Sequence, residues 1–407
     1  MGMSSKETWL TVLGVAVGLL FAVGLGVYSF LSTAATPLYS KAEDVPSVAQ
    51  TAPDEEWAGA AEQARQFTRA SLVEQNLPGL SVAVGVDGVI VWAEGFGWAD
   101  VESRTPVTPR TRFRIGHASK ALTSAAVGLL LEKDRLRLSD EIQTYVPAYP
   151  RKAWPVTLRQ LMGHIAGVRH YRNEADYMPT AHCDRASEGL QSFADDPLLF
   201  EPETQYKYST FGWILVSAAV EAVAGEPFFT FMRTQIFEPL GMADTTFDSG
   251  SDPLPDRATF YYPRLSGDPS FGPELATPVD YSCFAGAGGF LSTPSDLVRF
   301  GLALDAGKLL DPATVRQLQS SQLLASDKET EYGLGWMLET VTLAGESTRM
   351  AGHSSLTPLG GSAAFMTFPE RGLVVAVTSN ISRAGTRTIA LSLAEVFAKQ
   401  GASASRK

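Results

Sequence analysis

The chain has 407 residues, of which 45% are hydrophobic and 19% charged, and its formal net charge is −11. These values are typical of a folded protein with a large core, built as one sizeable domain or as two closely packed lobes. They exclude a collagen-like or low-complexity chain. The acidic balance, without any Lys/Arg-rich run, also argues against nucleic acid as a partner.

The N-terminal segment predicts a membrane span. Residues 9–31 (WLTVLGVAVGLLFAVGLGVYSFL) carry no charge, and a helix of this length, at about 1.5 Å per residue, spans a hydrocarbon core of about 30 Å. We expect an uncleaved signal anchor behind a short tail (residues 1–8), with the folded domain on the periplasmic or extracytoplasmic side. The alternative is a cleaved signal peptide, whose apolar core is usually shorter, about 7–15 residues.

The rest of the chain divides into a linker, a domain and a tail. Residues 32–54 are rich in Ala, Pro, Ser and Thr, which predicts a linker that holds the domain away from the membrane. The domain is expected over residues 55–400, and residues 401–407 are expected to form a short tail.

Within the domain, β-rich segments lie near both ends and helices lie between them. Residues 80–100 form two β-rich runs broken by Asp87-Gly88, which is a strong hairpin signal. Residues 362–380 again contain two β-rich runs, and a helix is predicted after them over about 386–398. An apolar, buried helix is predicted over 116–133. This order predicts an α+β fold, an α/β sandwich in which one sheet is built from both ends of the chain and a helical lobe forms a cleft.

Three short motifs carry residues suited to acyl chemistry. The first is His117-Ala-Ser-Lys120, in which positions three apart share one face of a helix. In an S-x-x-K unit this spacing holds a serine hydroxyl against a lysine amine, which accepts the proton when burial lowers the lysine pKa. The second is Tyr206-Lys-Tyr208-Ser209-Thr210, where a tyrosine can relay a proton. The third is Gly352-His353-Ser354-Ser355, just before a predicted strand.

The order and spacing of these motifs resemble the serine β-lactamase and penicillin-binding-protein superfamily. The closer likeness is to the branch with class C β-lactamases, family VIII esterases and the mitochondrial serine β-lactamase-like protein, the last through IAGVRHY and YSTFGW. The resemblance covers about residues 75–398. The supporting stretches are LMGHIAGVRHY (161–171), YKYSTFGWILVSAAVEAVAG (206–225), IFEPLGMADTTF (236–247), GAGGFLSTPSDLVRFG (286–301) and YGLGW (332–336).

The resemblance implies an antiparallel sheet flanked by helices and an acyl-transfer chemistry that needs no metal or other cofactor. Lys120 is then expected to act as the general base, Tyr208 as its partner and His353 as the residue of the third motif. The strand that carries Ser354 and Ser355 is expected to bind substrate and to supply one N–H group of the oxyanion hole, and the nucleophile's own N–H supplies the other.

Two positions depart from the family pattern. His117 stands where the nucleophilic serine is expected, and Ser355, followed by Leu356, stands where the family usually has glycines. His117 has three interpretations: it is itself a slow nucleophile for activated esters, it blocks an inactive site, or it binds a metal with His353 and Tyr208. The last set has one histidine fewer than a typical catalytic zinc site.

The remaining candidates are less specific. Ser119 is rotated about 100° from Lys120 on a helix, and Ser355 has no positioned base, so neither is expected to replace the nucleophile. His164 and His170 are expected to be structural or at the cleft rim, and residues 182–184 (His-Cys-Asp) are expected to form a surface loop. Cys183 and Cys283 form either one disulfide or two separate thiols.

The working hypothesis is a membrane-anchored hydrolase of this family with weak or altered activity because of His117. Its substrate would be an ester, a peptide or a β-lactam-like compound. The first alternative is a non-catalytic pseudoenzyme that binds such ligands. The second is a scaffold that assembles into filaments.

Overall fold

The computed structural model describes residues 5–34, 37–50, 52–250, 254–265, 267–357 and 360–404. Its largest sheet, among these residues, has eight strands in the order β1-β3-β2-β13-β12-β11-β10, with β4 added beside β3. The strands are β1 (Ser47–Ala49), β2 (Gly79–Val86), β3 (Val89–Asp100), β4 (Thr105–Pro106), β10 (Met337–Leu343), β11 (Glu346–Thr357), β12 (Gly361–Phe368) and β13 (Leu373–Ser379). All of its strand pairs are antiparallel.

Two small sheets lie outside the main one. The first joins β5, β9 and β6, and the second joins β7 and β8. Their strands are β5 (Phe113–Arg114), β6 (Thr246–Phe247), β7 (Tyr261–Pro263), β8 (Pro273–Leu275) and β9 (Phe290–Ser292). The strand β5 leads directly into the turn that carries His117.

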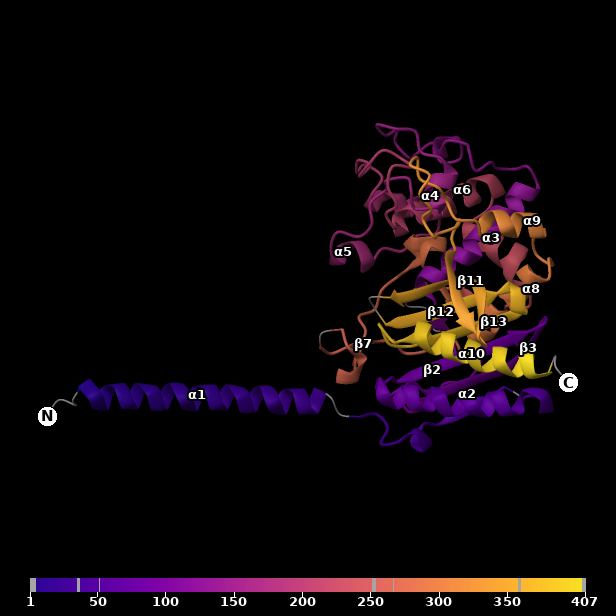
Figure 1. The fold of residues 1–407 in the computed structure, drawn as a ribbon. Helices are drawn as coiled ribbons and strands as arrows, with labels where there is room; N and C mark the ends of the chain where they lie inside the picture. Colours follow the sequence, from indigo (N-terminus) through magenta and orange to yellow (C-terminus); the bar gives the residue numbers. More distant parts are fainter. Residues whose placement is uncertain are drawn as a thin grey trace.

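Helices cover both faces of the main sheet (Figure 1). The α-helices are α1 (Ser5–Ala34), α2 (Glu55–Glu74), α3 (Ser119–Glu132), α4 (Leu158–Met162), α5 (Glu174–Tyr177), α6 (Thr210–Ala224), α7 (Phe228–Met232), α8 (Pro294–Asp305), α9 (Pro312–Leu318) and α10 (Thr386–Ala404). In Figure 1, α2 lies below the strands, and α3, α6 and the rest of the helical lobe lie above them. The helix α10 shares one core with α2, on the sheet face opposite the helical lobe.

The alternation of side chains along the central strands explains these two layers. On β2, Val82 and Val84 belong to the core between the sheet and the helices α2 and α10. Ala83 belongs to the core between the sheet and the helical lobe. Successive residues of a strand point to opposite faces, so a fully apolar strand supplies both cores at once. The pairing of β2 with β13, for example Val82 with Val377, confirms that one sheet is built from both ends of the chain.

Two predicted helices differ from the observed ones at their ends. The helix predicted from residue 116 begins as a 3₁₀ turn, η2 (Gly116–Ala118), and becomes α-helical only at Ser119. The C-terminal helix runs to Ala404, beyond the expected end near residue 398. The first difference matters for the site, because His117 lies in the 3₁₀ turn rather than in the α-helix.

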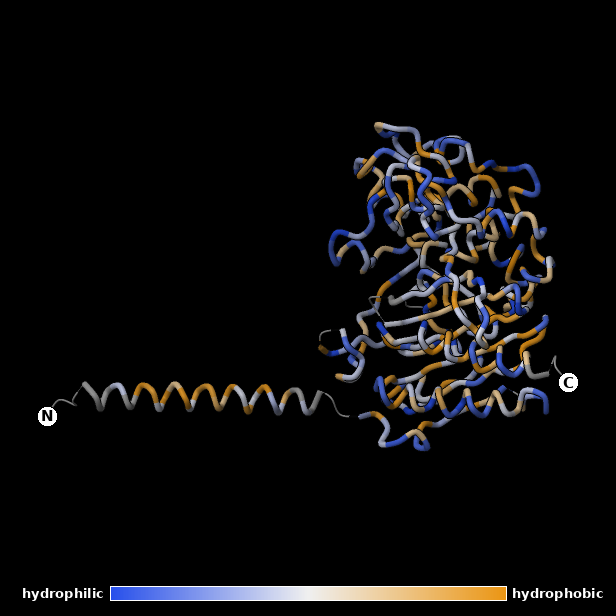
Figure 2. Tube along the Cα trace, viewed as in Figure 1, coloured by the Kyte–Doolittle hydropathy of each residue, from blue (hydrophilic) through white to orange (hydrophobic). Residues whose placement is uncertain are grey.

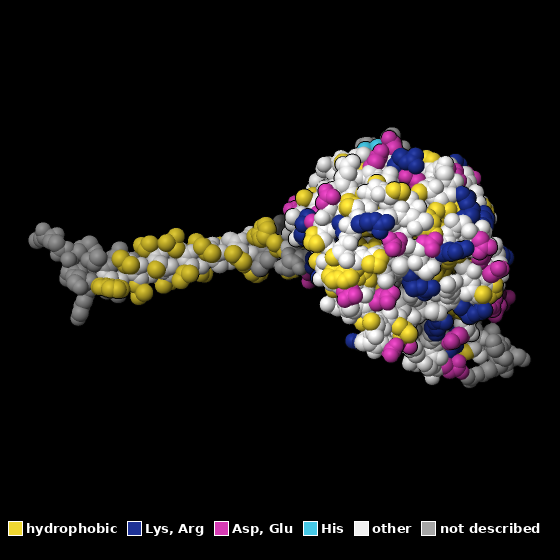
Figure 3. Space-filling view, turned by 90° about the horizontal axis from the view of Figure 1, so that it is seen from above, with side chains coloured by type: hydrophobic (Ala, Val, Ile, Leu, Met, Phe, Trp, Pro, Cys, Tyr) yellow, Lys and Arg dark blue, Asp and Glu magenta, His cyan; other side chains and the backbone are white. Residues whose placement is uncertain are grey.

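The helix α1 projects away from the domain (Figure 1), and its apolar character extends along its length (Figure 2). Figure 3 shows hydrophobic side chains along α1, whereas the visible face of the domain mixes basic, acidic and apolar groups. Residues Val12–Phe30 are long and apolar enough to cross a membrane, a test that a signal sequence near an N-terminus also passes.

Candidate active site

His117 occupies the turn that joins β5 to α3. Gly116, just before it, has φ +48°, a left-handed conformation that glycine adopts without strain. The partly buried imidazole places Nε2 3.3 Å from the hydroxyl oxygen of Thr210, the first residue of α6. The backbone N–H of His117 donates a hydrogen bond to the hydroxyl oxygen of Ser355, at 3.0 Å. The residue in the nucleophile position therefore contacts both the helical lobe and the sheet.

Lys120 lies one turn further along the chain and is fully buried. Its Nζ donates a hydrogen bond to the carbonyl oxygen of Ala287, at 2.7 Å, and lies 5.0 Å from the centre of the Tyr208 ring. Burial holds the pKa of the Lys120 amine well below its usual range. A neutral amine, able to accept a proton, thus lies beside the predicted tyrosine.

Tyr208 stands two residues before α6. Ser209 caps that helix, since its hydroxyl accepts the N–H of Gly212, and this cap directs the chain at Tyr208 into the site. The Tyr208 hydroxyl is buried and has no hydrogen-bond partner in the described part of the chain. Burial raises the Tyr208 pKa well above its usual value, so the phenol is neutral and its hydroxyl is available to a ligand.

Four of the five histidines surround the Tyr208 ring. The distances between ring centres are 4.1 Å for His164, 5.3 Å for His117, 5.7 Å for His170 and 6.2 Å for His353. Burial is the main cause that lowers the pKa of all four imidazoles, to about 4 for His170 and about 3 for His353. These imidazoles are therefore neutral near pH 7.

His353 lies on β11 with only 3% of its surface exposed. Its Nε2 is 3.1 Å from the hydroxyl of Tyr332, and its Nδ1 is 3.1 Å from the carbonyl oxygen of Ser354. A carbonyl only accepts, so Nδ1 carries the proton and Nε2 accepts from Tyr332. The Ser354 carbonyl thus fixes the tautomer of the histidine in the third motif, and the Tyr332 hydroxyl satisfies its other nitrogen.

A cavity of about 480 Å³ opens at these residues. Four of the six predicted site residues line it, namely His117, Tyr208, His353 and Ser354. The two others, Lys120 and Ser355, lie behind this surface, with 0% and 1% of their surface exposed. The remaining lining residues are Tyr206, Thr330, Glu331, Tyr332, Met337, Leu338 and Glu339.

Sequence reasoning gave no role to Thr210, the last residue of the second motif, and did not name Tyr332, although both contact predicted site residues. Each lies inside a stretch that carries the family resemblance, YSTFGW for Thr210 and YGLGW for Tyr332. The signal was therefore present in the sequence, but the direction of the side chains was not. Ser119 is fully buried and does not line the cavity, as its position on the helix predicts.

The described residues hold no group of three or more His, Cys, Asp or Glu side chains arranged to bind a metal ion. The loop at residues 182–184 is held by ordinary contacts, with His182 Nδ1 2.8 Å from a carboxylate oxygen of Asp280.

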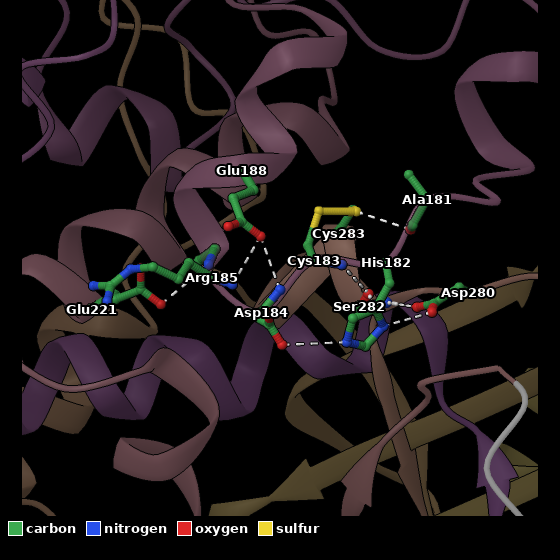
Figure 4. Close-up of a disulfide and its surroundings, with 11 residues drawn as sticks. Ala181, His182, Cys183, Asp184, Arg185, Glu188, Glu221, Asp280, Ser282 and Cys283 are labelled. Carbon is green, nitrogen blue, oxygen red and sulfur yellow. Dashed lines mark hydrogen bonds and ion pairs between the residues drawn. A yellow bond between two sulfur atoms is a disulfide. The ribbon is translucent and has the colours of Figure 1, made fainter.

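Cys183 and Cys283 form a disulfide, which settles the alternative that the sequence left open (Figure 4). The disulfide joins the loop of the helical lobe at Cys183 to the segment η7 (Ser282–Ala287). This segment ends at Ala287, whose carbonyl oxygen accepts the Lys120 hydrogen bond. The disulfide thus anchors the segment that supplies the hydrogen-bond acceptor of Lys120.

The antiparallel sheet between two helical layers, with a buried lysine one turn from the cavity and a tyrosine beside it, defines the class of the serine β-lactamases and penicillin-binding proteins. The chain belongs to this class, because the Beta-lactamase family model matches residues 60–396. The family is hydrolytic and acts on small-molecule or peptide substrates.

Several curated relatives are similar to this chain. The human and mouse proteins named "Serine beta-lactamase-like protein LACTB, mitochondrial" are 29% and 28% identical, with alignments that cover 84% of this chain and 80% and 81% of theirs. Penicillin-binding protein 4* of Bacillus subtilis is 26% identical over 68% of this chain and 63% of its own length.

Solved structures support the same fold. The octameric penicillin-binding protein homologue from Pyrococcus abyssi superposes with a TM-score of 0.69 at 23% identity, over 84% of this chain and 78% of that one. FmtA from Staphylococcus aureus superposes with a TM-score of 0.68 at 20% identity, over 86% of this chain and 92% of that one. At these identities the likeness establishes the fold alone.

Proposed function

We propose that this protein is a membrane-anchored acyl hydrolase of low turnover, in which His117 replaces the serine nucleophile and the substrate is an ester or a similarly activated acyl compound. The main observation in support is the arrangement of Lys120, Tyr208 and His117 at the cavity. A buried amine with a lowered pKa, Lys120, lies 5.0 Å from the centre of the Tyr208 ring, and the Tyr208 hydroxyl has no hydrogen-bond partner among the described residues. A neutral His117 lines the same cavity as Tyr208.

The chemistry of His117 sets the substrate class. A neutral imidazole attacks an acyl carbon and forms an acyl-imidazole, which water then hydrolyses. The imidazole expels an alkoxide or a phenolate far more readily than a peptide amine, because the amine is a much poorer leaving group. The proposed enzyme therefore hydrolyses activated esters slowly and amides or β-lactams hardly at all.

The remaining site residues have supporting roles in this proposal. Lys120 and Tyr208 move the proton of the attacking water, and no metal or other cofactor takes part. His353 positions the substrate from β11, with its tautomer set by the Ser354 carbonyl and its Nε2 bonded to Tyr332. The strand at Ser354 and Ser355 lies along the acyl group.

The proposed location is the extracytoplasmic side of a membrane, with α1 as an uncleaved anchor over residues 9–31. The linker expected at residues 32–54 is in part a piece of the domain, because Tyr39 and Val45 are buried in its core and β1 (Ser47–Ala49) pairs with β3. Two observations support the proposed location. The segment Val12–Phe30 is long and apolar enough to span a bilayer, and a disulfide such as Cys183–Cys283 persists mainly in oxidising compartments.

A non-catalytic ligand-binding protein is the second candidate. It is favoured by the contact between His117 Nε2 and the Thr210 hydroxyl, because this contact engages one ring nitrogen with the protein. The buried Tyr208 hydroxyl would then serve to bind a ligand rather than to move a proton.

The deciding experiment measures hydrolysis of a p-nitrophenyl ester by the full chain in detergent, beside the His117→Ala and His117→Ser variants. We expect the original chain to be clearly faster than the alanine variant, and both to be inactive on the matching p-nitroanilide. Equal rates for the original chain and the alanine variant would remove His117 from the chemistry and leave the binding protein as the better candidate.

Exposed histidines also hydrolyse such esters without any site, so the matched control is His182→Ala. His182 has 55% of its side-chain surface exposed and lies outside the cavity. Its replacement should leave the rate unchanged. If it removes the activity instead, the measured hydrolysis does not come from the cavity.

We also propose that the protein self-assembles, a property that does not depend on its activity. One structural neighbour is described as octameric, and the scaffold interpretation extends this to filaments. Concentration-dependent growth of particles under the electron microscope tests it. A constant particle size over a hundredfold concentration range would contradict it.

A further inference from the structure

The two departures from the family pattern, at residues 117 and 355, meet in space. We propose that the Ser355 hydroxyl is an internal stopper, which occupies the place where an acyl oxygen anion would bind to the N–H of residue 117. The inference deepens the function proposed above and rests on it. It predicts that a serine restored at position 117 stays slow until the hydroxyl at position 355 is removed.

The contact is short and buried. Ser355 lies on β11, opposite Ala363 of β12, with 1% of its surface exposed. It shares a strand face with His353 two residues away, and both residues pack against the turn that carries His117. The Ser355 hydroxyl oxygen accepts the backbone N–H of His117 at 3.0 Å.

That N–H is where negative charge develops during acyl transfer. Attack by residue 117 on a carbonyl carbon turns the carbonyl oxygen into an anion, and the nearest fixed donor is the N–H of the attacking residue itself. Such donors stabilise the anion at about 2.7–3.1 Å, and loss of one donor costs about 10²–10³ in turnover. The Ser355 hydroxyl already occupies this N–H within the same distance range.

A purely structural role for Ser355 predicts a different behaviour. If the hydroxyl only satisfies a buried N–H, its removal weakens the turn and lowers activity in every variant. The stopper predicts a gain of activity that depends on the nucleophile, because only a tetrahedral adduct at residue 117 uses the vacated N–H. The interaction between the two substitutions therefore separates the two roles.

The test uses the full chain in detergent with His117→Ser, alone and combined with Ser355→Ala, and a fluorophosphonate probe detected by intact mass. In this reaction the serine oxygen bonds to phosphorus, the P–F bond breaks, fluoride leaves and the hydroxyl proton passes to the neutral Lys120 amine. We expect the double variant to be labelled about 10²–10³ times faster than His117→Ser. Ser355→Ala in the His117→Ala background should gain nothing.

Ser347→Ala is the matched control, since Ser347 lies on the same strand but is exposed and far along it from the site. It should not change labelling of the His117→Ser variant. Equal labelling of His117→Ser with and without Ser355→Ala overturns the stopper, as does a complete absence of labelling in both. The proposed function is decided separately, by the original chain against His117→Ala with Ser355 intact.

Discussion

The amine of Lys120 donates a 2.7 Å hydrogen bond to the carbonyl oxygen of Ala287, which lies 167 positions further along the chain. A neutral amine uses one of its two hydrogens for this bond and keeps its lone pair for a proton. The bond therefore orients the lysine without consuming its capacity as a base. It also connects the base to the segment that the disulfide holds.

The role of Lys120 gives the first prediction. In the His117→Ser/Ser355→Ala background, Lys120→Met should lower ester turnover by about 10²–10⁴, because the buried proton acceptor is lost while the side-chain length is kept. Its free energy of unfolding should change by no more than about 2 kcal/mol. Steady-state kinetics and urea unfolding check both parts.

Lys120→Arg is the matched comparison. The guanidinium cannot lose its proton, so it places a permanent charge where Lys120 is neutral and fully buried. We expect a loss of about 3–5 kcal/mol in stability, or failure to fold. An arginine variant as stable as the original chain would mean that the pocket tolerates a charge and that Lys120 is not held neutral.

The pair formed by Tyr332 and His353 gives the second prediction. Tyr332→Phe removes the hydroxyl that lies 3.1 Å from His353 Nε2, and leaves a buried ring nitrogen without its donor. We expect a loss of about 1–3 kcal/mol, measured by urea unfolding at pH 7. Tyr206→Phe, on a side chain with 39% of its surface exposed, should change stability by less than about 0.5 kcal/mol. Equal effects of the two variants would contradict the assigned contact.

The buried histidines give the third prediction, a loss of stability in mild acid. The pKa of His353 is lowered to about 3 in the folded chain, whereas an unfolded histidine has a pKa of about 6.5. As the pH falls below 6.5, the unfolded state binds a proton that the folded state does not, so unfolding becomes easier. Between pH 7 and pH 5 this residue alone should cost about 2 kcal/mol.

His353→Gln should remove that part of the pH dependence, which urea unfolding at pH 7, 6 and 5 measures. His182 is the control with the opposite sign, because Asp280 raises its pKa and its stabilising effect is present at low pH and lost as the pH rises. His182→Gln should therefore leave the loss in acid as steep or steeper. The same slope in the original chain and in His353→Gln would refute the prediction.

The disulfide gives the fourth prediction. Cys183 and Cys283 close a long loop between the helical lobe and η7, so replacement of both by alanine should cost about 2–5 kcal/mol. Dithiothreitol should lower the free energy of unfolding of the original chain by a similar amount. It should leave the free energy of unfolding of the double variant unchanged. A reductant without effect on the original chain would show that the crosslink does not contribute to stability.

Local sequence signals predicted much of the fold. The hairpin of β2 and β3 turns at Asp87 and Gly88, with φ +48° and +90°, and an Asp-Gly pair is among the few that accept two positive φ values in a tight turn. The apolar runs near both chain ends predicted the sheet for a separate physical reason. A strand with two buried faces needs partners and helices on both sides.

The site was only partly predictable. The family resemblance singled out the six residues His117, Lys120, Tyr208, His353, Ser354 and Ser355, and the structure gathers them at one cavity or directly behind it. The resemblance did not indicate that Thr210 contacts His117 across 93 positions, or that the His164 ring lies tilted against the Tyr208 ring. Such contacts depend on the direction of side chains from distant segments, which no local pattern encodes.

The pairing of β2 with β13 has a consequence for synthesis. Its partners are about three hundred residues apart, for example Leu80 with Ser379, so the centre of the sheet is incomplete until the final part of the chain has left the ribosome. The nascent chain must keep the apolar strand β2 unpaired with β13 during nearly all of translation, and long-range strand pairing is slow. Chaperones that hold extended chains therefore have a long interval in which to act on this protein.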